Sequence, residues 1–371
     1  MQPKAVYMYL KRLKLFNFRN IAKADIQVSP GFNIFLGDNA QGKTNTLEAI
    51  YLLGHLKSFR RVGNLEMIGP CESRSRINGE FFYQAGLSRL ELTLGRESKT
   101  ILLDGKLPEH AGTIFADYSS VLFSPEEVAI VKGSPSARRA LLDRAICQTD
   151  PLFLDRARAF QRCLKQRNAL LKNVAQVSPT VLESWNEEFI KTGARIRFDR
   201  HCYLQRMVPR LKDAYRHIAN GLETADLIYP IEGQSQESYE NELRRNLQHL
   251  RTRETLYGAS LAGPHRDDPI FLVNERPLAQ YGSQGQQRSF MLAFKTAQVL
   301  DLEAVCGRSP LLLLDDMTSE LDQHRQAFFF QFLQGRTSQV FVTATEIGSL
   351  RLEGLKELRI FHVESGVLRD N

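Results

Sequence analysis

The sequence predicts an α/β protein in which a head built around a mixed sheet is interrupted by an inserted helical lobe. Three observations indicate this arrangement. Strand-like segments occupy both ends of the chain, a glycine-rich turn joins an early apolar strand to a helix, and amphipathic helical patterns dominate the middle. We therefore expect the first part of the head at residues 1–150, the lobe at residues 151–258 and the second part of the head at residues 259–371.

The first part of the head is predicted to hold strands around one helix. Residues 13–18 alternate as a half-buried strand does, and residues 32–36 form a short apolar strand. Residues 47–56 then recur at helical spacing, which completes a strand, loop and helix unit. The alternation from Leu87 to Leu103 is broken by a turn at residues 95–98, as in a hairpin. This hairpin indicates an antiparallel layer beside the first sheet.

Two long amphipathic helices are predicted in the lobe. One apolar stripe runs from Phe153 to Leu164 and the other from Leu182 to Leu211. The pair forms a short helical hairpin rather than a long coiled-coil arm. The second part of the head contains a helix from about Ser289 and four strand-like segments, at residues 270–273, 311–314, 340–342 and 358–363.

Bulk composition is that of an ordinary globular protein with a mildly basic balance, which many proteins that bind no nucleic acid share. A chain of 371 residues exceeds the usual size of one hydrophobic core, and 43% of its residues are hydrophobic. The net charge of +7 favours an anionic partner such as nucleic acid. No apolar run approaches the ~20 residues that span a bilayer, so we expect a cytoplasmic protein without a membrane partner. The five cysteines lack C-x-x-C spacing, which gives no indication of a zinc site.

The strongest motif is a complete G-x-x-x-x-G-K-T between the predicted strand and helix. Backbone N–H groups of such a loop hold the α- and β-phosphates of a nucleotide, and glycine lets the chain approach them closely. We expect Lys43 to reach the β- and γ-phosphates and Thr44 to bind Mg²⁺. The predicted ATP-binding residues are Gly37, Asp38, Asn39, Ala40, Gln41, Gly42, Lys43, Thr44 and the adjoining Asn45.

A second motif consists of four leucines followed by two aspartates, Asp315 and Asp316. The leucines predict a buried strand that delivers both carboxylates to the edge of the sheet. We expect Asp315 to hold Mg²⁺ and Asp316 to orient or deprotonate the attacking water, so that Asp316 and Lys43 are the predicted catalytic residues. ABC-type ATPases mostly carry glutamate at the position of Asp316, and the shorter side chain predicts slow hydrolysis.

A third motif, Ser283 to Arg288, is similar to the ABC signature sequence and retains its serine, second glycine and glutamine as Ser283, Gly285 and Gln286. In that class the signature contacts a nucleotide held by another subunit, which predicts an ATP-dependent homodimer with an ABC-type ATPase head. Residues 319–322 resemble the D-loop of the same interface. No Q-loop glutamine is identifiable in residues 121–126, and Thr345 occupies the place of the switch histidine without an assigned role.

Several segments together resemble the RecF family of ABC/SMC-type ATPases. They appear in the family's order along most of the chain and comprise residues 15–20, 42–50, 58–60, 263–268, 283–288 and 319–322. The resemblance implies DNA replication and repair, an ATP-dependent dimer that binds gapped DNA or single-/double-strand junctions, and action with RecR, RecO and RecA on single strands coated by SSB.

The DNA surface is predicted from runs of basic residues. Contact with the phosphate backbone needs cations spread along a face, and affinity should fall steeply with salt. Each cation could instead be the solvated side of an amphipathic helix. The candidates are Lys57, Arg60, Arg61, Arg138 and Arg139, followed by Arg144, Arg156, Arg158, Arg162, Lys165, Arg167 and Lys172.

Three alternative functions share some of these motifs. The nucleotide-binding subunit of a membrane transporter carries its phosphate motifs much closer in sequence than Thr44 and Asp315. A regulatory module that binds ATP without hydrolysing it is compatible with aspartate at position 316. An SMC-like structural clamp would need longer coiled coils than residues 151–258 provide.

Overall fold

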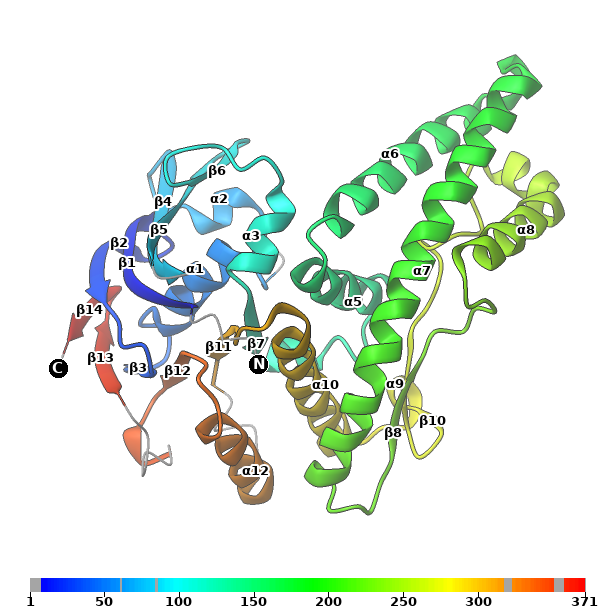
Figure 1. The fold of residues 1–371 in the computed structure, drawn as a ribbon. Coiled ribbons are helices and arrows are strands. Elements are labelled where there is room, and N and C mark those ends of the chain that lie inside the picture. Colours follow the sequence, from blue (N-terminus) through cyan, green and yellow to red (C-terminus); the bar gives the residue numbers. More distant parts are fainter. Residues whose placement is uncertain (1–7, 61, 84–85, 317–321, 350–356, 371) are drawn as a thin grey trace.

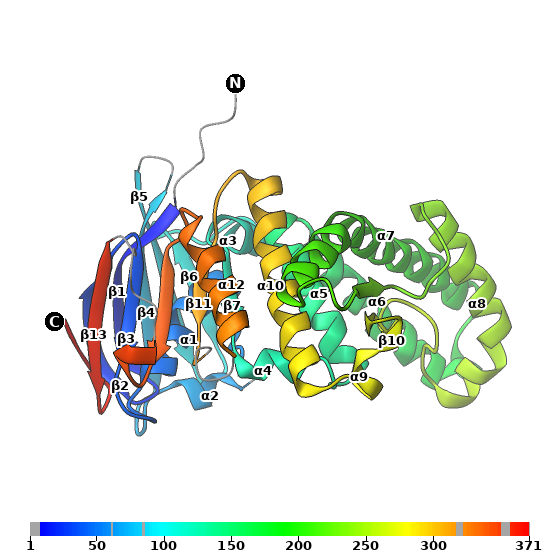
Figure 2. The ribbon, with the colours of Figure 1, turned by 90° about the horizontal axis from the view of Figure 1, so that it is seen from below.

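The computed structural model describes residues 8–60, 62–83, 86–316, 322–349 and 357–370. Figure 1 shows a head that contains the two large sheets and a lobe of long helices beside it. Viewed from below in Figure 2, the sheets lie at one end, helix α10 (Gln284–Cys306) crosses the middle, and the lobe helices occupy the other end. The predicted α/β head with a helical lobe is confirmed.

The central sheet has six strands in the order β14-β13-β3-β12-β11-β7. Strands β13, β3, β12, β11 and β7 pair in parallel, and β14 adds an antiparallel edge. Because parallel strands end at the same edge, the residues that follow β3, β7, β11 and β12 meet there. The strands span Phe32–Leu36 (β3), Ser120–Phe123 (β7), Leu311–Leu314 (β11), Val340–Ala344 (β12), Leu358–Glu364 (β13) and Val367–Asp370 (β14).

Both faces of this sheet are buried, each in a different hydrophobic core. In β11, Leu312 and Leu314 face the core that continues into the lobe helices. Leu311 and Leu313 face the core that contains helix α1 (Lys43–His55) and the second sheet. The alternation of side chains along a strand explains this division, and burial on both faces explains why β11 consists of four consecutive leucines.

The second sheet is antiparallel, with five strands in the order β2-β1-β4-β5-β6. It packs its apolar face on α1, and β5 and β6 form the predicted hairpin. The predicted antiparallel layer is therefore confirmed. Its strands span Met8–Phe18 (β1), Ile21–Gln27 (β2), Arg74–Tyr83 (β4), Gly86–Gly95 (β5) and Lys99–Leu103 (β6).

The lobe is built on α7 (Pro179–Ile218), a helix of 40 residues that runs from the distal tip to the head (Figure 1). At 1.5 Å per residue it is roughly 60 Å long. The helices that pack around it are α5 (Pro135–Thr149), α6 (Phe153–Lys172), α8 (Gln236–Tyr257) and α10. Since α10 carries the predicted signature at its start, the lobe packs directly on that motif's helix.

A small three-stranded sheet joins segments that lie on both sides of residue 258. Strand β8 (Ala225–Ile228) pairs with β9 (Ile270–Val273), which pairs with β10 (Arg276–Pro277). Residues on both sides of the predicted boundary therefore share one small sheet. The remaining elements are α2 (Asn64–Met67), α3 (Ala111–Asp117), α4 (Pro125–Val128), η1 (Val174–Gln176), α9 (Leu278–Tyr281), α12 (Gln323–Gln334) and η2 (Ile347–Ser349). Within the described ranges, no helix is long and apolar enough to cross a membrane.

Candidate nucleotide site

The glycine-rich loop follows β3 and ends where α1 begins, as the motif requires. A Cβ atom on Gly37 would lie 2.2 Å from the carbonyl oxygen of Val363, so the neighbouring strand excludes any side chain there. Gly42 precedes α1 with a φ of 119°, a conformation that side-chain-bearing residues rarely adopt. The close contact at Gly37 and the positive φ at Gly42 explain why both residues are glycine. Without side chains there, backbone N–H groups of the loop and of the first turn of α1 are available for phosphate oxygens.

Lys43 is folded over the loop. Its Nζ donates hydrogen bonds to the carbonyl oxygens of Gly37 at 2.5 Å and Asp38 at 2.8 Å. The residue is 8% exposed, and burial lowers the pKa of its amine, against the opposing charges of Asp316, Asp315 and Asp38. A phosphate in the loop would replace carbonyl dipoles with full negative charge next to this amine.

Asp315 and Thr44 meet beside the loop although 271 positions separate them in sequence. Thr44 Oγ1 donates to Asp315 Oδ1 at 2.8 Å, and Thr343 Oγ1 donates to the same oxygen at 2.8 Å. Burial raises the pKa of Asp315, and these two hydrogen bonds oppose that effect. A hydroxyl and a carboxylate are hard oxygen donors that fit Mg²⁺, so the pair suits the predicted metal role.

Asp316 adopts a left-handed backbone conformation with a φ of 49°. Its backbone N–H donates to Thr343 Oγ1 at 3.0 Å. Aspartate is several times more common than most residues in this conformation, which gives a local reason for the shorter acid at this position. The side chain is exposed and lines the same pocket as the glycine-rich loop at residues 37–44, called the P-loop from here on.

The pocket beside the P-loop collects several of the predicted nucleotide residues. It is lined by Asn39, Ala40, Gly42, Lys43, Thr44, Asn45, Arg60, Asp316, Thr343 and Thr345. Sequence reasoning placed Arg60 on a DNA surface and gave Thr343 no role, whereas both line this pocket. The signature residues Ser283, Gly285 and Gln286 do not line it.

The RecF-like segments near the N-terminus converge beneath the loop. Glu48 of α1 is fully buried and pairs with Arg19 at 2.8 Å and Arg60 at 3.6 Å. Arg60 also donates to Asn45 Oδ1 at 2.9 Å, and Asn45 donates to Asn20 Oδ1 at 2.8 Å. The segments at residues 15–20, 42–50 and 58–60 therefore act as one network that holds the P-loop helix.

The signature segment caps α10. The Ser283 hydroxyl accepts a hydrogen bond from Gln286 N at 3.1 Å, and Gln286 Oε1 accepts one from Ser283 N at 2.9 Å. This reciprocal cap fixes the helix N-terminus, where free N–H groups favour an anion. Gly285 lies against Arg325 of α12, whose guanidinium donates to Ser289 at 2.7 Å. Of the D-loop-like segment, residues 319–321 lie outside the described residues, and Asp322 caps α12.

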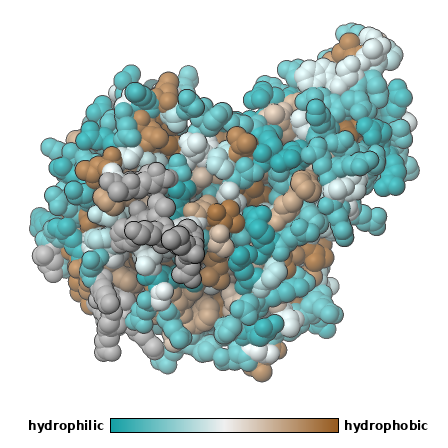
Figure 3. Space-filling model, in the orientation of Figure 1, coloured by the Kyte–Doolittle hydropathy of each residue, from teal (hydrophilic) through white to brown (hydrophobic). Residues whose placement is uncertain are grey.

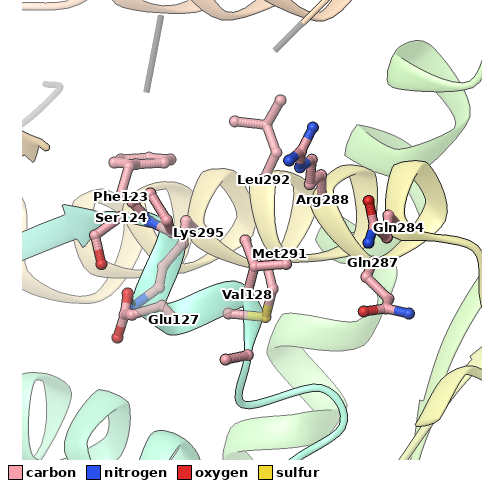
Figure 4. A pocket seen from close by; sticks show the side chains of 12 residues that line it. Phe123, Ser124, Glu127, Val128, Gln284, Gln287, Arg288, Met291, Leu292 and Lys295 are labelled. Atoms are coloured by element: carbon pink, nitrogen blue, oxygen red, sulfur yellow. Dashed lines mark ion pairs between the residues drawn. The ribbon is translucent and has the colours of Figure 1, made fainter. Parts of the chain in front are cut away.

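A cavity of about 220 Å³ lies between α10 and residues 123–129, the segment that follows β7 (Figure 4). Figure 4 shows Lys295 of α10 and Glu127 of α4 pointing toward each other, and their Nζ and Oε2 atoms are 2.5 Å apart. Arg144 of α5 contacts the other oxygen of Glu127 at 3.1 Å. A buried charge cluster therefore joins the segment after β7 to the signature helix.

Two residues predicted to contact DNA, Arg138 and Arg139, form hydrogen bonds within the protein. Arg138 is 8% exposed and donates to both carboxylate oxygens of Asp268, at 2.8 and 2.7 Å. Arg139 donates to the Asp267 carbonyl at 2.6 Å, and Asp267 pairs with Arg197 at 2.7 Å. Arg138 is thus not available to a DNA phosphate, and the turn at residues 263–268 is an anchor for α5 and α7. Arg61 lies outside the described residues, and Lys57 is exposed.

Replacing Thr343 with valine is expected to weaken Mg²⁺-dependent nucleotide binding roughly 10- to 100-fold, the usual cost of removing a group that orients a metal ligand. Valine keeps the shape but removes the donor to Asp315 and the acceptor for Asp316 N. Titration of a fluorescent ATP analogue against Mg²⁺ concentration measures this effect. Thr343→Ser, which keeps the hydroxyl, should stay near wild type; equal losses in both variants would assign the effect to packing.

Comparison with known proteins supports one family. The sequence pattern described as RecF/RecN/SMC N terminal domain matches residues 9–369. The chain is 53% identical over 363 residues to the DNA replication and repair protein RecF of Syntrophotalea carbinolica, covering 98% of this chain and 99% of that protein. It is 39% identical over 366 residues to RecF of Geobacter sulfurreducens, covering 97% and 99%.

Solved structures agree with this relationship. A structure described as recombination mediator protein RecF-ATP in the RecFOR pathway matches with a TM-score of 0.90 and 30% identity, covering 99% of this chain and 100% of that one. An Smc head domain from Pyrococcus furiosus matches with a TM-score of 0.56 and 15% identity over 98% and 96% of the two chains, which is a likeness of fold alone. Since family pattern, relatives and structures agree over nearly the whole length, the chain belongs to the RecF family of DNA replication and repair proteins.

Proposed function

We propose that this protein binds Mg-ATP, forms a homodimer when ATP is bound, and binds gapped DNA or single-/double-strand junctions during recombinational repair. The contact that carries the proposal is the hydrogen bond of 2.8 Å between Thr44 of the P-loop and Asp315 at the end of β11. It brings together the two groups that a P-loop ATPase uses to hold Mg²⁺. The RecF structure described with ATP is a relative of this chain over its whole length.

The site residues have separate roles in this proposal. The loop amides and Lys43 hold the phosphates, and Thr44 with Asp315 would hold Mg²⁺, which supplies charge neutralisation when bound. Thr343 keeps the Asp315 carboxylate in place. Asp316 reaches the pocket from the next position and orients the attacking water. Its short side chain makes turnover slow, and DNA is expected to accelerate it.

Dimerisation follows from the separation of the two phosphate-binding motifs. The described residues that line the P-loop pocket come from the loop after β3, from α1, from Arg60 and from the ends of β11 and β12, with none from the signature segment. Ser283, Gly285 and Gln286 would therefore contact a nucleotide held by a second copy of the chain. ATP then lies between two subunits and contributes contacts to both.

The DNA surface is proposed along α6 and the adjoining edge of the head. Arg158, Arg162, Lys165 and Lys172 are exposed and fall on one face of α6. Burial raises the pKa of Cys147 on α5 to about 12, and the positive charges of Arg158 and Lys57 oppose this rise. The face of the lobe that Figure 3 shows is mainly hydrophilic. Arg167, by contrast, is 3% exposed and pairs with Glu254, so it does not contribute to this face.

Reversing two charges on this face, Arg162→Glu with Lys165→Glu, is expected to weaken DNA binding at least about 10-fold at low salt and to reduce the slope of log affinity against log salt by about two. Fluorescence anisotropy with a gapped duplex over a salt series measures both quantities. Lys11→Glu with Lys23→Glu changes the charge equally on the antiparallel sheet, where both lysines are exposed. If the control pair lost as much affinity as the α6 pair, the effect would reflect net charge and not this face.

The family resemblance supports the wider role: action with RecR and RecO in loading RecA onto single strands coated by SSB. Sedimentation of the protein with a fluorescent gapped duplex, with and without Mg-ATP, tests the central proposal. Dimers that bind DNA when ATP is present are expected. The proposal would be wrong if the protein sedimented as a monomer with and without ATP and did not bind the DNA.

A second candidate function is a regulatory module that holds ATP without hydrolysing it. The observation that favours it is Asp316, whose short carboxylate replaces the usual glutamate. A phosphate-release assay on the purified chain separates the two proposals. Release by the wild type that is abolished in Asp316→Asn would favour an ATPase.

A further inference from the structure

Glu223 lies between the signature motif and the longest helix of the lobe. It belongs to the turn that joins α7 to β8. Its Oε1 accepts a hydrogen bond from Gln286 Nε2 at 2.7 Å, and its Oε2 accepts one from the Tyr215 hydroxyl at 2.7 Å. Each carboxylate oxygen thus contacts a different part of the molecule, one in the signature and one in the lobe.

On the signature side, the Gln286 side chain is fixed at both ends. Its Oε1 accepts from Ser283 N at 2.9 Å while its Nε2 donates to Glu223. The amide oxygen faces a donor and the amide nitrogen faces a carboxylate, so the flipped orientation would lose both bonds. Removal of the Glu223 carboxylate would leave the cap intact but free the Nε2 end of the side chain.

On the lobe side, Tyr215 lies in the last turn of α7 and is fully buried. Burial and the Glu223 carboxylate raise the pKa of Tyr215, so its hydroxyl remains a proton donor. A hydrogen bond to a charged partner is stronger than one between neutral groups. The end of α7 is therefore tied to the turn at residues 219–224.

Other contacts between α7 and α10 involve the bodies of the helices. Asp301 is fully buried and lies 3.4 Å from Arg206 and 3.3 Å from Arg210. Asp301 is more than three turns from the start of α10, so these two ion pairs hold the helices together without contacting the signature. Glu223 differs because its partner, Gln286, is a signature side chain.

We propose that Glu223 is a positioning residue: it orients Gln286 for the nucleotide of the second subunit and, through Tyr215, couples engagement of the signature to the lobe. The inference rests on the proposed ATP-dependent dimer. Movement of Gln286 toward a partner's phosphate must either carry Glu223 along or break their hydrogen bond. Either event changes the restraint on the head end of α7. The helix contains Pro209 but remains helical from Pro179 to Ile218, so it transmits that change toward the tip.

The chain contains a built-in reporter of the lobe. Trp185 is the single tryptophan of the sequence and lies on α7, 30 positions before Tyr215, a separation of roughly 45 Å along a helix. Its fluorescence therefore follows the lobe and not the nucleotide site. A change on addition of Mg-ATP, recorded together with the sedimentation coefficient, reports coupling and dimerisation in the same sample.

Tyr215→Phe tests the coupling, and Tyr203→Phe is its matched control. Tyr203 lies on the same helix and is 1% exposed, and its hydroxyl has no hydrogen-bond partner within the described ranges. We expect the wild type and Tyr203→Phe to show the full Trp185 response. Tyr215→Phe should form the ATP dimer with a dissociation constant within about threefold of wild type, because the hydrogen bond between Glu223 and Gln286 remains. It should show less than about half of the wild-type change in Trp185 fluorescence.

Variants at Glu223 test the positioning role. Glu223→Ala is expected to raise the dissociation constant of the ATP dimer about 10-fold, the usual order for one charged hydrogen bond, and to lose the Trp185 response. Glu223→Gln keeps an acceptor for Tyr215 but places an amide against the Gln286 amide, so dimerisation should be weakened similarly. Double substitution, Glu223→Gln with Gln286→Glu, restores a donor and an acceptor and should recover part of the Trp185 response among the dimers that form.

Two results would overturn the inference. One is a full Trp185 response in Tyr215→Phe, and the other is a wild-type protein that dimerises with ATP while Trp185 fluorescence stays unchanged. If the wild type formed no dimer with ATP at all, the proposed function would fail first, so the two failures are distinguishable.

Discussion

Lys43→Met is expected to reduce ATP affinity roughly 10- to 100-fold, because one charge-assisted contact with phosphate is worth about 1.5–3 kcal/mol. Hydrolysis should fall further, by about 10²- to 10³-fold, because charge develops on the transferred group in the transition state. Isothermal titration with ATP and a phosphate-release assay measure the two effects. The dimer and its DNA complex should then no longer respond to ATP.

Lys43→Arg is the informative companion. Arginine keeps the charge, but its planar fork cannot occupy the position over the Gly37 and Asp38 carbonyls that the compact ammonium takes. We expect partial ATP binding with hydrolysis close to that of Lys43→Met. Normal turnover in either variant would show that the loop is not the catalytic phosphate site.

Ser283→Arg is expected to leave ATP binding within about threefold of wild type, since Ser283 does not line the P-loop pocket and distant sites act independently. Dimerisation should weaken at least about 100-fold, because a bulky charge without a partner at the centre of an interface costs several kcal/mol. Gel filtration with and without Mg-ATP measures the dimer.

Loss of the helix cap must be separated from this steric effect. The Ser283 hydroxyl caps α10, and losing such a cap costs about 1 kcal/mol of stability. Ser283→Ala removes the cap and the hydroxyl contact to the partner's nucleotide without adding bulk, so it should weaken the dimer much less than Ser283→Arg does. An ATP-dependent dimer in Ser283→Arg would mean that the signature assignment is wrong.

The head was predictable because its signals are local. The P-loop and the leucine strand before Asp315 are short patterns in which residue type follows directly from backbone geometry or burial. The contact between Thr44 and Asp315 follows once both are placed at the carboxyl edge of one parallel sheet. Thr343 could have been found in the same way, because it is the penultimate residue of β12 and its side chain points to Asp315.

The DNA candidates were less predictable because a sequence displays cations without their partners. Arg138 pairs with Asp268, 130 positions away, and Arg167 pairs with Glu254, 87 positions away. Long-range pairing of this kind removes a charge from the surface without leaving a local signal. The pairing of β8 with β9 was missed for a similar reason, since strands of four residues carry little alternation.

Strand β3, which leads into the P-loop, has β12 and β13 as its two neighbours. Both are synthesised about 300 residues after it, which takes roughly 15–60 s at ordinary translation rates. Until then the apolar segment Phe32–Leu36 lacks its strand partners on both edges, a state that favours aggregation and recruits chaperones. The P-loop also gains a stabilising contact only near the end of synthesis, because Gly366 N donates a hydrogen bond to the Gln41 carbonyl at 2.8 Å. A nascent chain therefore acquires its phosphate site only near the end of synthesis, and its refolding rate should be limited by closure of this long-range sheet.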